Sequence, residues 1–297
     1  MSSRSLNRLI IFGEVLYDRF PDGSVVLGGA PFNVACHLQA FGLSPLFISR
    51  VGDDALGRRV RDAMLERGMD TSALQQDSAH PTGTVDVSFP AGEPSFDIVA
   101  GRAYDFIEFD ALPPLPEQGI CYHGSLAVRN QTSRDTLRKI KQQTGGAWFV
   151  DVNLRAPWWS LDEISACLRD ARWIKLNEDE LRQILPGDGS TLQRAARLLA
   201  NLSAQLLVVT LGKAGAIALS ADGGNFEVRP VAGARVVDSV GAGDAFSSVL
   251  LLGQSLGWRT GDTLSRAQDF ASAIVGVRGA TVEPGFYQPF LADWKLR

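Results

Sequence analysis

The strongest constraint on the fold is an alternation of short, continuous apolar runs with stretches of helical periodicity. Apolar runs predict buried strands at LIIF (9–12), PLFIS (45–49), AWFVDV (147–152), RWIKL (172–176) and QLLVVT (205–210). Runs that stay apolar at successive positions are typical of a parallel sheet covered on both faces. Periodic apolar positions between the runs predict helices over 31–41, 55–67, 190–203 and 262–277. The order predicts an α/β fold: a doubly wound, mostly parallel sheet with helices on both faces.

Two stretches break this alternation. Residues 14–28 and 82–100 alternate apolar and polar side chains around Pro-Asp-Gly and Pro-Ala-Gly-Glu-Pro turns. This pattern predicts antiparallel strands with one solvated face. Because such strands are too few to be stable alone, we expect them to join into a small β lid. The lid is formed by about 14–28 and 82–105, on a single domain that spans residues 1–297.

Composition restricts the possible partners. The chain has 297 residues and a net charge of −4, with no run of Lys or Arg, so a nucleic-acid partner is not expected. Its three cysteines lack C-x-x-C spacing and predict neither a disulfide framework nor a zinc site. No apolar stretch is long enough for a signal peptide or a membrane span, so we expect a cytoplasmic protein with small-molecule ligands.

The segment 235–257 carries the clearest chemical signal. Val236 and Val237 predict the end of a strand, and a helical run follows the sequence Gly-Ala-Gly-Asp at 241–244. Two glycines let backbone N–H groups converge, and a helix N-terminus adds partial positive charge, so the loop predicts an anion site. Asp244 would lie at its edge and accept a proton from an attacking hydroxyl. An aspartate is also common in a first helical turn, so its position alone leaves a purely structural role open.

Other nucleotide-binding loops do not fit this segment. It lacks the lysine of a P-loop, and Phe246 stands where a dinucleotide fingerprint has its third glycine. An NAD-dependent oxidoreductase is therefore disfavoured.

Several motifs occur in a characteristic order along the chain. They are LGGAPFNVACHLQAFG (27–42), SRVGDDALGRRV (49–60), DVNLRAPWW (151–159), KLNEDE (175–180), VTLGKAGA (209–216) and DSVGAGDAF (238–246). Together they resemble the ribokinase, or PfkB, family of carbohydrate kinases, with Ser239 where its C-terminal signature usually has Thr. The resemblance runs from about Gly13 to Glu283. It implies a ribokinase-like fold, ATP as phosphoryl donor, Mg²⁺, a monovalent cation such as K⁺, and a homodimer formed through the lid.

The resemblance also implies roles for individual residues around the transferred phosphoryl group. It makes Asp244 the catalytic base, with an anion hole formed by the N–H groups of Gly241, Ala242 and Gly243. It assigns Mg²⁺ and phosphate, through water, to Asn177 and Glu180, although a polar helix start would explain this pair too. It places along the nucleotide Thr210, Gly212 and Gly215, which a plain hairpin turn would also explain.

The sugar and cation sites are implied in the same way. The residues implied to contact the sugar are Asp18, Gly29, Asn33, Arg102 and Arg155, with Tyr104 nearby. A surface ion pair is the alternative for Arg155. The cation would be held by Asp238 and the carbonyl groups of Val240 and Gly279, unless Asp238 only caps a turn.

Within the family, the combination GExLxD, GGAPFNVA and DVNLRxPxW looks most like fructokinases. Fructose is therefore the expected substrate, phosphorylated on a primary hydroxyl. Kinases for 2-keto-3-deoxygluconate, ribose or a nucleoside are the alternatives. A catalytically silent sugar- or nucleotide-binding regulator on the same fold is a further one.

Overall fold

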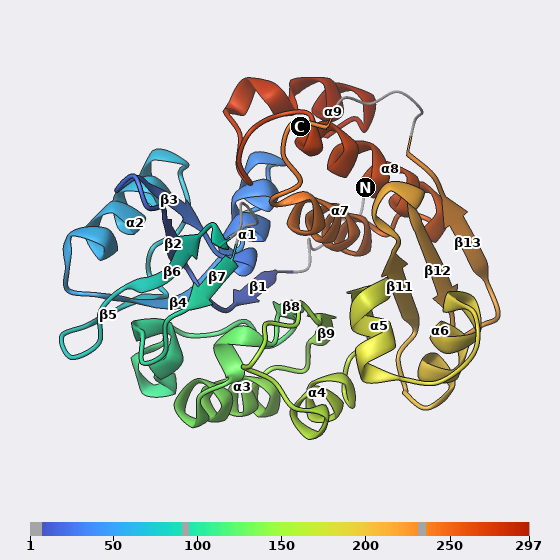
Figure 1. The fold of residues 1–297 in the computed structure, drawn as a ribbon, viewed down its shortest axis with the longest axis horizontal. Helices are drawn as coiled ribbons and strands as arrows, with labels where there is room; N and C mark the ends of the chain where they lie inside the picture. Colours follow the sequence, from blue (N-terminus) through green and yellow to red (C-terminus); the bar gives the residue numbers. More distant parts are fainter. Residues whose placement is uncertain (1–7, 91–94, 231–235, 297) are drawn as a thin grey trace.

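The computed structural model describes residues 8–90, 95–230 and 236–296. Within them, the main sheet has the strand order β13-β12-β11-β10-β9-β8-β1-β4-β5 (Figure 1). Its strands are β1 (Leu9–Phe12), β4 (Leu46–Gly52), β5 (Leu74–Asp77), β8 (Ile120–His123), β9 (Ala147–Asp151), β10 (Trp173–Asn177), β11 (Leu206–Thr210), β12 (Ala216–Ser220) and β13 (Asn225–Val228). All neighbours from β5 to β11 pair in parallel, and β12 and β13 add an antiparallel edge. The predicted mostly parallel sheet is confirmed.

Helices cover both faces of this sheet (Figure 1). The first face carries α1 (Ala30–Ala40), α2 (Ala55–Glu66), α7 (Ala242–Leu256) and α8 (Thr260–Val275), and the second carries α3 (Gln131–Gln143), α4 (Leu161–Leu168), α5 (Glu178–Ile184) and α6 (Thr191–Ala200). A last helix, α9 (Gln288–Asp293), follows α8. Short 3₁₀ helices are η2 (Ala103–Phe106), η3 (Phe109–Ala111), η4 (Leu126–Val128), η5 (Gly212–Ala214) and η6 (Pro284–Tyr287).

Alternate side chains of one strand supply the two cores. Ile11 packs in the core beneath α1 and α7, whereas Ile10 packs in the core beneath α3. Both are fully buried. This two-sided burial explains why the strand sequences are apolar at every position. None of the helices in the described ranges combines the length and apolar character needed to cross a membrane.

A separate small sheet has the order β3-β2-β6-β7 and lies beside α2, where the Arg59 guanidinium packs over the Tyr17 ring (Figure 1). Its strands are β2 (Leu16–Arg19), β3 (Val25–Gly28), β6 (Gly83–Ser88) and β7 (Ser95–Ile98). The β2–β3 and β6–β7 pairs are antiparallel, as predicted, but β2 and β6 pair in parallel. The predicted small sheet of antiparallel pairs is confirmed, and the two hairpins join through their first strands, which run in the same direction.

One correction concerns the approach to α7. Val236 and Val237 do not end a strand; they lie in a loop and are 69% and 48% exposed. The Val237 N–H donates to the carbonyl of Val275 at the end of α8, at 2.9 Å. These valines therefore resemble a strand in sequence, but among the described residues they pair with no strand.

Candidate active site

The glycine loop before α7 has the shape that an anion site requires. Gly241 is the N-cap of α7 with φ of 80°, and a Cβ at this position would lie 2.5 Å from Ala280. Only glycine fits both the left-handed backbone and the contact. The first N–H groups of a helix have no partners within the helix and carry partial positive charge. Asp244 stands in the first turn of α7, beside these groups.

Asp244 contacts a residue that lies 211 positions earlier in the chain. The Asn33 amide, on α1, donates a hydrogen bond to the Asp244 carboxylate at 2.8 Å. Burial raises the pKa of Asp244 to about 6, and the Asp151 carboxylate adds to the rise. The Asn33 hydrogen bond and the charges of Lys175 and Arg155 act in the opposite direction. A carboxylate with this pKa is mostly ionised at neutral pH and is more basic than an exposed aspartate, which suits a general base.

Arg155 lies among several carboxyl groups. Its positive charge lowers the pKa of Glu14, Asp18 and Asp244, against the larger effect of burial, which raises each of them. Its side chain is exposed, and within the described residues it forms no ion pair and donates only to the carbonyl of Leu154, at 3.1 Å. The alternative of a surface ion pair therefore finds no support in the described contacts.

Gly29 and Asp18 lie on the lid side of the same region. Gly29 has φ of 108°, and a Cβ there would lie 2.7 Å from the backbone oxygen of Glu14. Asp18 lies on β2, and its carboxylate is 3.8 Å from the position of a Cβ at Gly28. Burial raises the pKa of Asp18. At Gly29 the two backbones approach so closely that only glycine fits, which places the start of α1 directly against Glu14.

Glu14 was missed in the sequence analysis. Its side chain is 3% exposed, and one carboxyl oxygen has no hydrogen-bond partner among the residues that the structure describes. Burial raises its pKa to about 7, and the Asp244 charge contributes to the rise. Glu14 comes two residues after β1, at the carboxyl edge of the sheet, where open α/β folds bind ligands. That rule could have drawn attention to it.

The segment after the lid is more buried than expected. Tyr104 is fully buried, and its hydroxyl accepts a hydrogen bond from Arg129 at 3.0 Å. Arg129 also forms an ion pair with the buried Asp105 at 2.8 Å. Arg102 is half-buried, and its backbone N–H donates to Asp105 at 3.1 Å. Tyr104 thus belongs to a buried network, and only Arg102 retains an accessible side chain.

Asn177 and Glu180 form a capping box at the start of α5. Asn177 accepts from the N–H of Glu180, and Glu180 accepts from the N–H of Asn177, both at 2.8 Å. The second Glu180 oxygen accepts from the N–H of Leu154 at 2.9 Å. The polar helix start considered above is therefore present. In the described ranges no group of three or more His, Cys, Asp or Glu gathers around a metal position.

The segment from Thr210 to Gly215 connects two antiparallel strands, so the hairpin considered above is also present. The Leu211 N–H donates to the carbonyl of Gly215 at 2.7 Å. Gly215 has φ of 102°, and a Cβ there would lie 1.9 Å from the carbonyl oxygen of Val228. Gly212 has φ of 56° and no atom near its missing Cβ, so it faces open space.

Asp238 links two loops that are distant in sequence. Its carboxylate accepts from the N–H of Val240 at 3.0 Å and from the N–H of Gly279 at 3.1 Å. It therefore caps a turn, and it also brings together the three residues predicted to surround a cation.

Two further charged residues, Asp151 on β9 and Lys175 on β10, are buried in this region and were not singled out from the sequence. The Lys175 ammonium lies 3.1 Å from both carboxylate oxygens of Asp151. Each comes at or near the carboxyl end of its strand, as Glu14 does.

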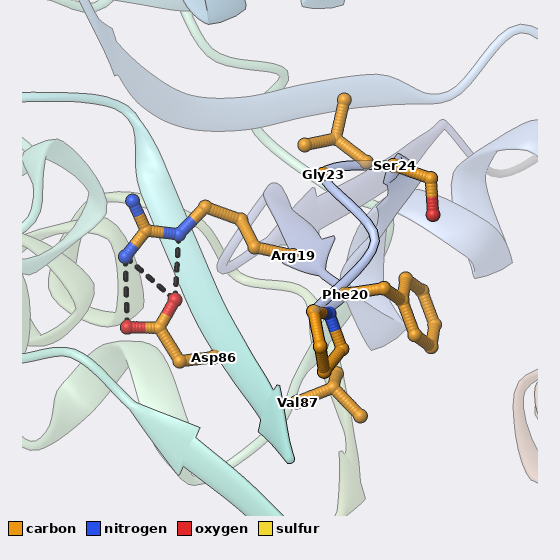
Figure 2. A pocket seen from close by; sticks show the side chains of 8 residues that line it. Arg19, Phe20, Gly23, Ser24, Asp86 and Val87 are labelled. Carbon is orange, nitrogen blue, oxygen red and sulfur yellow. Dashed lines mark hydrogen bonds and ion pairs between the residues drawn. The ribbon is translucent and has the colours of Figure 1, made fainter.

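The hollow shown in Figure 2 lies elsewhere, on the outer part of the small sheet. It holds about 370 Å³ and is lined by Arg19, Phe20, Pro21, Gly23, Ser24, Val25, Asp86 and Val87. Its charged groups neutralise each other, because Arg19 binds both oxygens of Asp86 at 2.6 and 2.8 Å. The region around Asp244 instead brings together groups with shifted pKa values, so it is the candidate active site.

Known proteins resemble this chain over most of its length. The model of the pfkB family of carbohydrate kinases matches residues 6–284. A fructokinase from Klebsiella pneumoniae is 35% identical over 262 residues, which are 83% of this chain and 84% of that protein. An aminoimidazole riboside kinase from Salmonella typhimurium is 30% identical over 288 residues, covering 92% of this chain and 85% of that one.

Solved structures show the same fold. The crystal structure of fructokinase from Vibrio cholerae O395 with fructose, ADP and calcium has a TM-score of 0.81 and 26% identity, covering 96% of this chain and 99% of that one. A double mutant of that enzyme with fructose, ADP and potassium also has a TM-score of 0.81, with 26% identity, covering 97% of this chain and 99% of that one. The ribokinase-like fold is confirmed, and the chain belongs to the pfkB family of carbohydrate kinases. It is a carbohydrate kinase, and the relatives that it resembles include several fructokinases.

Proposed function

We propose that the protein transfers the γ-phosphoryl group of ATP to a primary hydroxyl of fructose, with Asp244 as general base. The observation that supports this best is the position of Asp244: it lies beside the glycine loop at the start of α7 and is hydrogen-bonded to Asn33. One carboxylate therefore borders both an anion site and the region of sugar-side residues.

In the proposed reaction the sugar hydroxyl oxygen attacks the γ-phosphorus, and the bond from that phosphorus to the β–γ bridging oxygen breaks. Asp244 accepts the hydroxyl proton, and the products are a sugar phosphate and ADP. The N–H groups of Gly241, Ala242 and Gly243 stabilise the charge of the transferring group.

Mg²⁺ would neutralise phosphate charge in this reaction. Mg²⁺ usually keeps several waters and binds through substrate phosphates and one or two carboxylates, so a dedicated cage of protein ligands is not required. Glu180 and Asn177 fit such a contact through water, because their oxygens already lie at the carboxyl edge of the sheet. Thr210, Gly212 and Gly215 would line the nucleotide, and the open space beside Gly212 supports its part in this contact.

Fructose is the proposed sugar because the polar groups on the sugar side suit neutral hydroxyls. Asn33 has a buried amide oxygen without a partner in the described residues, and Asp18 offers a carboxylate. Both can bind vicinal hydroxyls, with Gly29 leaving space and Arg102 at the margin. Arg155 is the group that could instead favour an acid sugar. The fructokinases among the relatives add support.

A riboside is the second candidate, because the Salmonella relative is named as an aminoimidazole riboside kinase. The deciding experiment measures kcat/KM by ADP release for fructose, 2-keto-3-deoxygluconate, ribose and a nucleoside under one condition. We expect fructose to exceed the others by orders of magnitude, because unpaired polar groups in a buried site strongly penalise the wrong substrate. A higher value for another compound would replace fructose. ADP release independent of every sugar would contradict the kinase assignment, and Asp244→Asn controls for contaminating kinases.

We also propose that the small sheet is a lid that pairs with a second copy of the chain. Val26 and Phe96 are 45% and 54% exposed on its strands, and exposed apolar groups on one sheet are typical of an interface. Sedimentation velocity should detect a dimer for the native chain and a monomer for Val26→Glu/Phe96→Glu. Leu65→Glu on α2, another exposed apolar residue, is the matched control and should leave the dimer intact. A native monomer would refute this arrangement.

A further inference from the structure

An ion pair is buried directly beneath the glycine loop, and the reaction proposed above gives it no role. Asp151 and Lys175 lie opposite each other on the neighbouring strands β9 and β10. Their side chains are 1% and 8% exposed, and the ammonium is 3.1 Å from the carboxylate. Removing two charges from water costs free energy that their attraction often does not recover, so stability alone is a weak reason for such a pair.

The pair is joined to the helix that carries Asp244. Ser247, one turn after Asp244 on α7, donates a hydrogen bond from its hydroxyl to Asp151 at 2.7 Å. The hydroxyl of Tyr122 approaches the same carboxylate oxygen at 3.4 Å. Ser247 and Tyr122 are both fully buried. Asp151 therefore fixes the start of α7 relative to the sheet.

The Lys175 ammonium lies close to the loop. A Cβ at Gly243 would lie 3.2 Å from the Lys175 ammonium. Lys175 shares a face of β10 with Trp173, whose side chain belongs to the core under α7. The positive end of the ion pair thus lies against the backbone that would hold the transferring phosphoryl group.

On the basis of the function proposed above, we propose that Lys175 is a positioning residue for phosphoryl transfer. Its ammonium lies beneath Gly243, and Asp151 holds it there and connects it to α7 through Ser247. A fixed positive charge in a buried place adds to the partial charge of the helix N-terminus and stabilises the negative charge that develops on the γ-phosphoryl group. Asp151 keeps the ammonium oriented, because both of its carboxylate oxygens accept from it.

The rival explanation is that the pair only holds the fold together. A double variant separates the two explanations, because it removes both charges and leaves neither partner buried alone. Lys175→Met/Asp151→Asn should unfold near the native Tm, whereas the single variant Lys175→Met should be less stable because Asp151 loses its partner. Lys139→Met, the same change at an exposed position on α3, is the matched control.

We expect the double variant to lose about 10²–10³-fold in kcat, comparable to the loss of one donor from an anion hole, with little change in the KM of the sugar. If the double variant has a native Tm and a kcat within about threefold of the native value, the pair is purely structural and the proposal is overturned. If the double variant fails to fold, the binding measurement below decides.

Nucleotide binding gives a test that does not depend on turnover. Calorimetry compares ADP with a non-hydrolysable ATP analogue in the native chain and in Lys175→Met. We expect the analogue to lose about tenfold more affinity than ADP, because only the analogue places a γ-phosphoryl group over the loop. Equal losses would refute the role of Lys175. If the native chain phosphorylates no sugar, the proposed function fails, and the binding comparison still decides this inference.

Discussion

The pH dependence of the reaction tests the assignment of Asp244 as the base most directly. Burial places its pKa at about 6, whereas an ordinary aspartate titrates near 3.8. A general base must be unprotonated, so kcat/KM should rise with pH until Asp244 is ionised. With a pKa of about 6, roughly nine-tenths of Asp244 is ionised at pH 7 and roughly one-tenth at pH 5.

The expected result is a fall of about tenfold in kcat/KM between pH 7 and pH 5. An aspartate with the ordinary pKa would still be about nine-tenths ionised at pH 5, so its profile would be nearly flat over this range. The assay is the initial rate of ADP release at limiting sugar, with coupling enzymes in excess at each pH. Asp244→Asn should lower kcat by about 10²–10⁴-fold, because the amide cannot accept the proton.

Glu14 provides the necessary control, because its pKa is raised to about 7 and it lies close to Asp244. If Glu14 caused the fall, Glu14→Gln would abolish it. If Asp244 causes it, Glu14→Gln should keep the acidic limb and move it to slightly lower pH, since one neighbouring negative charge is lost. A flat native profile from pH 5 to 7, or an unchanged limb in the residual activity of Asp244→Asn, would refute the reasoning.

Three further predictions address the surroundings of the base. Because the pKa of Glu14 is raised in the folded state, the folded protein loses stability as pH rises from 4.5 through 7 and Glu14 ionises. Glu14→Gln should therefore raise Tm on the order of 5 °C at pH 8 and hardly at all at pH 4.5. An equal change in Tm at both pH values would contradict the argument from burial. K⁺ should activate turnover more than Na⁺ at equal ionic strength, and Asp238→Asn should remove the difference; identical native rates in the two salts would exclude the cation site. Gly29→Ala should raise the sugar KM and lower Tm, because its Cβ would collide with the Glu14 backbone; native values of both would show that the loop can adjust.

Much of the fold could be predicted because the strands are buried on both faces. LIIF at 9–12 and QLLVVT at 205–210 are apolar at successive positions, and both are strands of the parallel sheet. The pairing of β2 with β6 could not be predicted, because alternation along one strand contains no information about a partner some 70 residues away. Val236 and Val237 show the opposite failure: local apolarity suggested a strand, but in the described part of the chain the Val237 N–H pairs with the end of α8 and not with a strand.

In the candidate site, too, some features could be predicted from the sequence and others could not. The glycines before Asp244 are visible in sequence because a left-handed N-cap needs Gly241. The contact between Asn33 and Asp244 is not visible, since it depends on how α1 packs against α7. Glu14 was also missed, although its place two residues after β1, at the carboxyl edge of the sheet, could have drawn attention to it.

Asp151 and Lys175 are different, because the sequence contains a signal for them. Each is a charged residue inside an otherwise apolar strand, in AWFVDV and RWIKL. A buried charge is costly unless it is paired, and the two residues have opposite charges. Consecutive strands of a parallel sheet are usually neighbours, so Asp151 and Lys175 should fall side by side. Both charges come at or near the carboxyl ends of their strands, and this is the edge at which open α/β sheets bind ligands. The pair is therefore expected beneath the element that binds the ligand. In this chain that element is the glycine loop before α7. A Cβ at Gly243 would lie only 3.2 Å from the Lys175 ammonium, so the positive charge of Lys175 acts at short range on any anion that the loop binds.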